Sequence, residues 1–225
     1  MTKFNKLVIF DCDGTLVDSQ HMIIGSMHDT FDKAGFERRT DQEVRAIVGL
    51  SLYEAIASLL PNERADVHAA MTNDYKQIFY DRRTRQGVGP DPLYDGTREA
   101  LVALNDAGYL LGVATGNSRR GLDRVLVEHD LTDFFVTLQT ADGHPSKPHP
   151  SMILTALAEA GSSPDNAVMI GDTSYDIMMS VKAGTAPIGV NWGYHSEDIL
   201  AEVGAKHIAS HYDQVPALVQ AAIGD

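Results

Sequence analysis

The chain has 225 residues, of which 44% are hydrophobic, so it can bury a core and is not a disordered chain. Lys and Arg number 18 and Asp and Glu number 31, which gives a formal net charge of −13. This acidity argues against nucleic acid and against an anionic membrane surface as partners, because both attract basic faces.

Short apolar runs alternate with amphipathic stretches along most of the chain. The runs predict buried parallel strands at 6–10, 109–114, 134–138, 167–170, 186–190 and 206–209. The amphipathic stretches predict helices at 97–107, 119–129, 151–160, 175–183 and 214–223. Gly108, Gly161 and Gly184 stand just past three of these helices, where a left-handed cap needs glycine. This alternation predicts an α/β fold with a Rossmann-like parallel sheet covered on both faces.

Residues 17–86 interrupt this alternation, because they contain no strand pattern. Segments 40–43 and 51–54 have the spacing of capping boxes and predict two short helices, which end near Gly49 and Pro61. A longer helix is predicted at 63–85, and the Gly- and Pro-rich segment 87–92 predicts a return linker. We therefore expect a discontinuous α/β core domain, 1–16 and 87–225, with an inserted all-helical domain at 17–86.

Two aspartates, Asp11 and Asp13, follow the first predicted strand. In an open α/β sheet, ligands bind at the carboxyl ends of the strands. Residues two apart in extended backbone point to the same side, and two carboxylates so close repel unless a cation lies between them or one holds a proton. The alternative reading is a turn or a helix N-cap, since Asp-Gly is common in turns.

Four segments carry a resemblance to a known family. Residues 11–19 (DCDGTLVDS) resemble the first motif of the haloacid dehalogenase superfamily of phosphatases. Residues 113–117 (VATGN), 146–150 (SKPHP) and 169–176 (MIGDTSYD) resemble the second, third and fourth motifs, in the family's order. The chain is most similar in pattern to members with a helical cap, such as the phosphoglycolate phosphatases, so the inserted domain is expected to be such a cap.

The resemblance implies a role for each matched residue. Asp11 would be the nucleophile, and Asp13 the general acid and then the base. The resemblance implies that four residues bind the phosphoryl oxygens and neutralise their charge: Thr115, Gly116, Asn117 and Lys147. Of these, Thr115 and Lys147 would also be catalytic. A Mg²⁺ ion would be held by Asp11, the backbone carbonyl of Asp13, Asp172 and, through water, Asp176. Without the other motifs, the preferred reading of Asp172 and Asp176 is a pair at a helix N-terminus, stabilised by the helix dipole.

The turn at 48–52 is where such caps reach the substrate, and it offers one hydroxyl, that of Ser51. We therefore expect a small, weakly recognised phosphomonoester as the substrate. The alternative is that these residues only pack the cap. A β-phosphoglucomutase-like activity stays open, since those isomerases share all four motifs, although the apolar turn disfavours it. A 2-haloacid dehalogenase is disfavoured because those enzymes lack the aspartate found here as Asp13. The intact motif set argues against a non-enzymatic binding scaffold.

The remaining expectations concern partners and location. A single cysteine, Cys12, cannot form an internal disulfide, and no apolar run approaches the roughly 20 residues that span a bilayer. The N-terminal segment lacks the pattern of a signal peptide. We expect a cytoplasmic monomer or homodimer that binds a small phosphorylated metabolite, with neither nucleic acid nor membrane as a partner.

Overall fold

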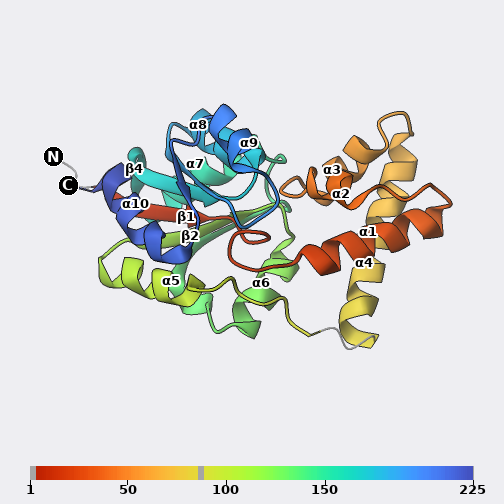
Figure 1. Ribbon diagram of the computed structural model, residues 1–225, viewed down its shortest axis with the longest axis horizontal. Helices are drawn as coiled ribbons and strands as arrows, with labels where there is room; N and C mark the ends of the chain where they lie inside the picture. Colours follow the sequence, from red (N-terminus) through yellow and green to blue (C-terminus); the bar gives the residue numbers. More distant parts are fainter. Residues whose placement is uncertain (1–3, 86–88, 225) are drawn as a thin grey trace.

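The structure, a computed structural model, describes residues 4–85 and 89–224 and has a parallel sheet between helices, with a further group of helices beside it (Figure 1). The strand order is β3-β2-β1-β4-β5-β6, and every paired strand is parallel to its neighbour. The predicted α/β fold is confirmed. The strands are β1 (Asn5–Phe10), β2 (Leu110–Thr115), β3 (Phe135–Thr140), β4 (Ser162–Gly171), β5 (Ala186–Val190) and β6 (His207–Ala209).

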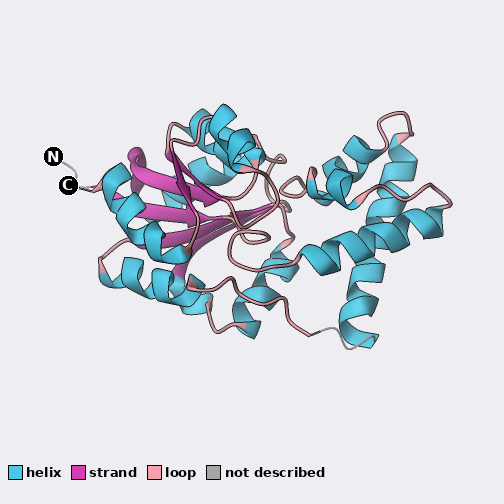
Figure 2. Ribbon diagram, viewed as in Figure 1, coloured by secondary structure: helices cyan, strands magenta, loops and turns pink. Residues whose placement is uncertain are grey.

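Helices cover both faces of the sheet because its strands are apolar on both sides (Figure 2). In β1, Val8 and Phe10 pack in one hydrophobic cluster, with α5 (Thr97–Asp106), α6 (Arg119–Glu128) and α10 (Val215–Ile223). Leu7 and Ile9 pack in the other, with α7 (Ser151–Ala160) and α8 (Ser174–Ala183). A short helix, α9 (Glu197–Glu202), packs against α8 and β5. Buried strands on both sides therefore hold the sheet between two helical layers.

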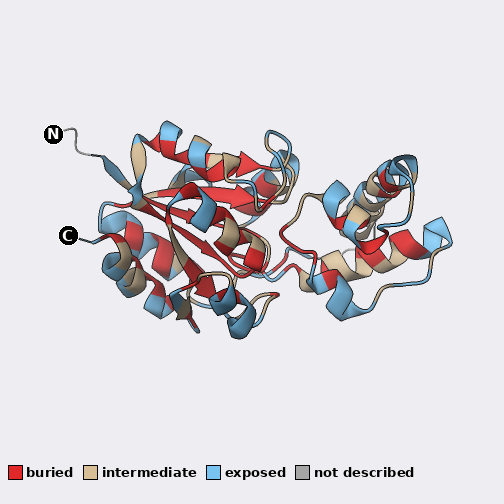
Figure 3. Cartoon of the chain, turned by 90° about the horizontal axis from the view of Figure 1, so that it is seen from above, coloured by how far each residue is buried: buried red, intermediate tan, exposed pale blue. Residues whose placement is uncertain are grey.

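The insertion after β1 consists of α1 (Gln20–Ala34), α2 (Asp41–Arg45), α3 (Leu52–Leu59) and α4 (Ala65–Arg85). Every residue from 18 to 85 is described, and none lies in a strand. These helices pack around a cluster of their own that includes Phe31, Ile56 and Met71. Figure 3 shows buried residues inside this group as well as around the sheet. The predicted all-helical insertion is therefore present and has its own core.

Several elements differ from the prediction, and two of these differences have a clear physical reason. β4 begins five residues before the predicted strand, because Ser162 pairs with Asn5 beyond an irregularity in the register. α1 had no separate prediction, since neither an acidic first turn nor a side-chain cap marks its start. The predicted helix caps are confirmed by φ values of 86° at Gly108, 60° at Gly161 and 75° at Gly184.

Of the predicted return linker, residues 87 and 88 lie outside the described residues. Its end is held to the start of the insertion, where the Asp18 N–H donates to the Pro92 carbonyl at 2.8 Å. Among the helices of the described part of the chain, none combines the length and apolarity needed to cross a membrane.

Candidate active site

The candidate residues gather at the carboxyl edge of the three central strands. Asp11 follows β1, Thr115 ends β2 and Asp172 follows β4, and β1 lies between the other two strands. The Asp11 N–H donates to the carbonyl of Ile170 at 2.9 Å, which continues the ladder one step past the strand. The parallel sheet therefore places three sequence-distant side chains at one edge.

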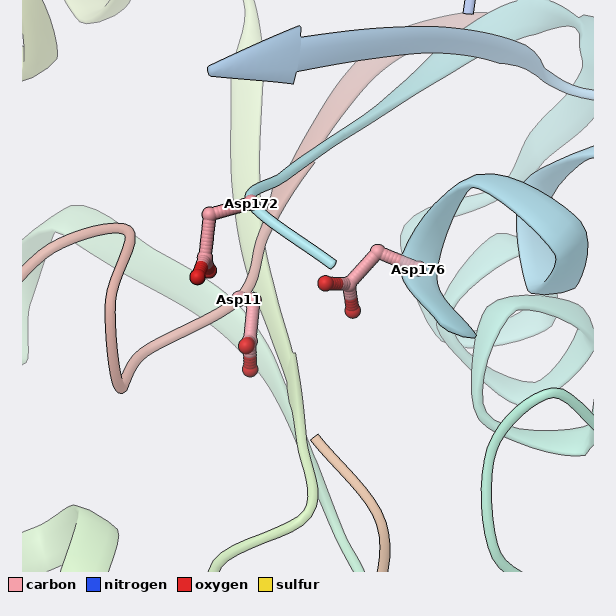
Figure 4. Close-up of side chains that lie close together, drawn as sticks. All are labelled: Asp11, Asp172 and Asp176. Carbon is pink, nitrogen blue, oxygen red and sulfur yellow. The ribbon is translucent and has the colours of Figure 1, made fainter. Parts of the chain in front are cut away.

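Three carboxylates form a buried cluster at this edge. One oxygen from each of Asp11, Asp172 and Asp176 lies within 4.8 Å of the others, and all three residues are buried. Figure 4 shows Asp11 and Asp172 side by side, with Asp176 reaching toward them from the first turn of α8. The carboxylate of Asp13 is not part of this cluster.

Lys147 supplies the cation of the cluster. Its side chain is fully buried, and its Nζ lies 2.9 Å from Asp11 Oδ1 and 2.6 Å from Asp176 Oδ1. Burial alone would lower the pKa of Lys147, but the two carboxylates outweigh burial and raise it, so the ammonium stays charged. Lys147 therefore lies beside Asp11, the residue that it is predicted to orient.

One ammonium does not balance three buried carboxylates. Burial raises the pKa of Asp11 to about 7, since the lowering by Lys147 does not compensate for burial and for the nearby charge of Asp176. Burial, with the charges of Asp11 and Asp176, also raises the pKa of Asp172 well above its usual range. Burial and mutual repulsion thus disfavour the charged form of two of the three carboxylates, and a bound cation would offset both effects. A hard divalent cation with oxygen ligands, such as Mg²⁺, fits this donor set.

Neighbouring groups fix the two later carboxylates. Asp172 Oδ1 accepts from Thr15 Oγ1 at 2.7 Å, and its Oδ2 accepts from the Tyr194 N–H at 2.8 Å. Asp176 Oδ2 accepts from Thr173 N at 3.1 Å and from Thr173 Oγ1 at 2.7 Å, in the capping box of α8. One oxygen of Asp176 therefore caps the helix, as the helix N-terminus reading predicts, and the other oxygen faces the lysine.

Sequence reasoning missed Thr15, Thr173 and Tyr194. For Thr173, the spacing Thr-x-x-Asp at the start of a predicted helix was a usable signal. Thr15 lies inside the first motif, but no pattern indicates that its hydroxyl reaches Asp172, which is 157 residues away. Tyr194 bonds Asp172 through its backbone N–H, so the residue type gives no signal of this contact.

Asp13 lies apart from the cluster and beside the second motif. Its Oδ2 accepts from Asn117 Nδ2 at 3.1 Å, and the Asn117 N–H donates to Thr115 Oγ1 at 3.1 Å. Ser118 caps α6 by accepting from Gly121 N at 3.2 Å. The motif residues thus form one connected turn between a half-buried acid and the start of a helix.

The insertion touches this edge through the turn at residues 46–51. A Cβ on Gly116 would lie 2.6 Å from the carbonyl oxygens of Gly49 and Leu50, so the turn packs directly on the second motif. The Tyr175 hydroxyl of α8 donates to the Ala46 carbonyl at 3.0 Å. The insertion is therefore seated on the carboxyl edge of the sheet in this structure.

Ser51 lies in this turn, but one prediction for it is wrong. Its N–H donates to Ser146 Oγ at 2.8 Å, and its side chain makes no capping bond to α3. A capping box needs that N–H for Glu54, and a contact with the core takes it instead. The matching prediction at Thr40 and Glu43 is confirmed as a full capping box.

Two hollows border the insertion. One of about 610 Å³ lies between α3 and the loop at 145–150, and its lining includes Leu50, Glu54, Ser146, Lys147 and Tyr175. The other, of about 780 Å³, lies at the foot of α1 and includes none of the clustered carboxylates. The smaller hollow therefore has the more direct relation to the candidate site, through Lys147.

Comparisons with known proteins agree with this geometry. The sequence profile of the family described as haloacid dehalogenase-like hydrolase matches residues 8–190. The chain is 33% identical over 221 residues to the probable phosphatase IndB of Dickeya dadantii, covering 96% of this chain and 94% of that protein. It is 33% identical over 200 residues to the pyrophosphatase PpaX of Bacillus pumilus, covering 86% of each chain.

A phosphoglycolate phosphatase of Vibrio vulnificus is 29% identical over 202 residues, which covers 87% of this chain and 88% of that protein. Among solved structures, a predicted phosphatase from Clostridium acetobutylicum superposes with a TM-score of 0.86 at 25% identity, covering 97% of this chain and 100% of that one. The similarity thus extends over the sheet and the insertion together.

Proposed function

Because the chain belongs to the haloacid dehalogenase-like hydrolases, we propose that it is a Mg²⁺-dependent phosphatase that hydrolyses a small phosphomonoester through an aspartyl-phosphate. The observation that carries the proposal is the buried cluster of Asp11, Asp172 and Asp176 around Lys147. It combines a carboxylate nucleophile, a fixed ammonium and an excess of negative charge at one edge of the sheet.

In the first step an oxygen of Asp11 attacks phosphorus, and the bond from phosphorus to the leaving oxygen breaks. Lys147, held by Asp11 and Asp176, orients the nucleophile and stabilises the charge on the phosphoryl oxygens. Asp13 donates its proton to the leaving alkoxide. Its separation from the buried cluster and its contact with Asn117 suit this task, because the leaving group departs away from Asp11.

In the second step Asp13 takes a proton from water as the water oxygen attacks the phosphorus of the aspartyl-phosphate. The bond to Asp11 breaks, and inorganic phosphate leaves. Thr115 and the backbone of Gly116 and Asn117 hold the phosphoryl oxygens through both steps, at the turn before α6.

The proposed metal ligands are Asp11, Asp172 and the backbone carbonyl of Asp13, with Asp176 acting through water. Bound Mg²⁺ supplies charge neutralisation and alignment of the phosphoryl group. Thr15, Thr173 and Tyr194 keep the carboxylates of Asp172 and Asp176 in fixed orientations, which lowers the cost of organising the site.

We assign residues 17–86 to a cap domain and residues 1–16 and 87–225 to the core domain. The separate hydrophobic cluster of the insertion supports this division. The contact of Gly49 and Leu50 with Gly116 supports a cap that closes over the site and excludes water. Ser51 remains the proposed cap contact to the substrate.

The substrate is proposed to be a small phosphorylated metabolite. The relatives named above act, by name, on phosphoglycolate or as pyrophosphatases, so small anionic esters and anhydrides form the first set to test. Phosphomutase activity is the second candidate to assay, on the ground of shared motifs.

The decisive experiment is phosphate release from 4-nitrophenyl phosphate and from a panel of phosphorylated metabolites, with Mg²⁺ or with EDTA. Isomerisation of glucose 1-phosphate is measured in parallel. We expect release only with Mg²⁺, and none from Asp11→Asn. The matched control is Asp95→Asn, whose side chain is 98% exposed and which should keep wild-type turnover. Activity in EDTA would refute the metal assignment, and an active Asp11→Asn protein would refute the nucleophile.

A further inference from the structure

Tyr194 touches both the candidate metal site and the start of the insertion. It lies in the loop after β5, and its residue is 9% exposed. Its backbone N–H donates to Asp172 Oδ2 at 2.8 Å. Its hydroxyl lies 3.1 Å from the hydroxyl of Ser19, and both groups are buried. One residue therefore bonds a candidate metal ligand with its backbone and the insertion with its side chain.

Ser19 lies at the start of the insertion. It immediately precedes α1 and is 1% exposed. As the N-cap of α1 it would ordinarily accept from the first turn of the helix. It makes no such bond here, because its hydroxyl pairs with Tyr194 instead. The start of the insertion is thus attached to the core by a tertiary hydrogen bond in place of a local cap.

The residues around Asp172 and Tyr194 are tightly packed. A Cβ on Gly14 would lie 2.3 Å from Asp172 Oδ2 and 2.4 Å from Tyr194 Cδ2. The Thr15 carbonyl accepts from Trp192 Nε1 at 3.2 Å and from the Tyr212 hydroxyl at 2.7 Å. Thr15 itself donates to the other oxygen of Asp172 at 2.7 Å. Ser19 is therefore linked by one hydrogen bond to Tyr194, which contacts Asp172, and the 14–15 turn contacts Asp172 as well.

We propose that Tyr194 is a positioning residue that couples the start of the insertion to the orientation of Asp172, so that insertion position and divalent-cation affinity depend on each other. The inference rests on the proposed function, because it takes Asp172 as a metal ligand. Coupling of two sites is reciprocal, so a change that loosens Ser19 should change cation affinity. We expect weaker binding, because Tyr194, which orients Asp172, is then held less firmly. Ser19 is more informative than Tyr194 in this respect, because it has no contact of its own with Asp172 among the described bonds.

The test measures Mg²⁺ affinity of the full chain without substrate. Trp192 is the single tryptophan of the chain and donates to Thr15, so its fluorescence reports on the turn that holds Asp172. Calorimetry gives the same affinity independently. The variants are Tyr194→Phe, Ser19→Ala and their combination. Tyr194→Phe keeps the backbone bond to Asp172 and removes only the hydroxyl.

We expect each single variant to raise the Mg²⁺ midpoint by roughly three- to tenfold, the range that one hydrogen bond controls. The double variant should be no weaker than the weaker single variant, because both remove the same bond. The control is Tyr212→Phe, which removes a buried hydroxyl from the Thr15 carbonyl while Trp192 Nε1 still occupies it. It should lower Tm but change the Mg²⁺ midpoint less than twofold.

An unchanged midpoint in either single variant would overturn the coupling, and so would multiplied effects in the double variant. An equal loss of affinity in Tyr212→Phe would reduce Tyr194 to a structural role. Absence of Mg²⁺ binding to the wild type would overturn the inference together with the metal assignment. Expected affinities with no phosphate release by the wild type would instead refute the proposed function and leave the coupling standing.

Discussion

The charge balance of the buried cluster makes Lys147→Met the most informative perturbation. The lysine side chain is fully buried and is paired with Asp11 at 2.9 Å and with Asp176 at 2.6 Å. Methionine approximates its volume without its charge. The substitution leaves three carboxylates within 4.8 Å of one another and no cation among them.

The expected loss of stability follows from removing one partner of a buried ion pair. Removing one partner of such a pair costs about 3 to 5 kcal/mol, because a buried charge is left without compensation. For a chain of 150 to 250 residues, each kcal/mol lowers Tm by roughly 2 to 4 °C. The metal-free variant should therefore melt about 6 to 20 °C below the wild type at pH 8.

The pH dependence gives the prediction a sign as well as a size. The pKa of Asp11 is raised from its ordinary value of 3.8 to about 7 in the folded protein. The folded state therefore binds a proton that the unfolded state has lost, and the contribution of this group to stability falls as pH rises from about 4 to about 7. Without Lys147 the pKa of Asp11 rises further. The loss of stability of the variant relative to the wild type should therefore be larger above pH 7 and smaller at pH 5.5.

The assay is thermal unfolding in EDTA and in Mg²⁺, at pH 5.5 and pH 8, followed by circular dichroism. Mg²⁺ should recover part of the lost Tm, because it restores positive charge, whereas phosphate release should stay abolished. Lys206→Met is the matched control, since Lys206 is exposed and the change should cost less than about 0.5 kcal/mol. A metal-free variant that melts within 2 °C of the wild type at pH 8 would refute the charge-balance reasoning.

Two further predictions concern the acid and the contact with the insertion. Asp13→Asn should lower kcat/KM, which reports the steps up to departure of the leaving group, by roughly 10²- to 10⁴-fold for an alkyl phosphate and by much less for 4-nitrophenyl phosphate, whose leaving group needs no proton; equal losses of kcat/KM for both substrates would contradict the general-acid role. Gly116→Ala places a Cβ 2.6 Å from two carbonyl oxygens of the insertion, so we expect at least a tenfold lower kcat/KM with little change in Tm. Gly143→Ala, where a Cβ meets nothing within 4 Å, serves as its control, and wild-type kcat/KM in Gly116→Ala would show that the seated turn is not needed.

Local patterns predicted the sheet well because buried parallel strands are continuous apolar runs. The strand at 186–190 and the helix at 151–160 have their predicted bounds. The start of α1 had no separate prediction, and there the hydroxyl of Ser19 bonds a tyrosine 175 residues away instead of capping the helix. The capping box at Ser51 failed for a similar reason, because Ser146 of the core takes its N–H.

The sequence by itself determined that Asp11, Thr115 and Asp172 stand at the ends of apolar strands, and hence at one edge of the sheet. Such positions can be predicted locally, because a strand and the turn that follows it are formed by consecutive residues. The tertiary structure alone decided which side chains converge: Lys147 lies between Asp11 and Asp176, while the carboxylate of Asp13 turns to Asn117. Burial and the summed charge of groups more than 100 residues apart set the pKa of Asp11, and no local pattern contains that sum.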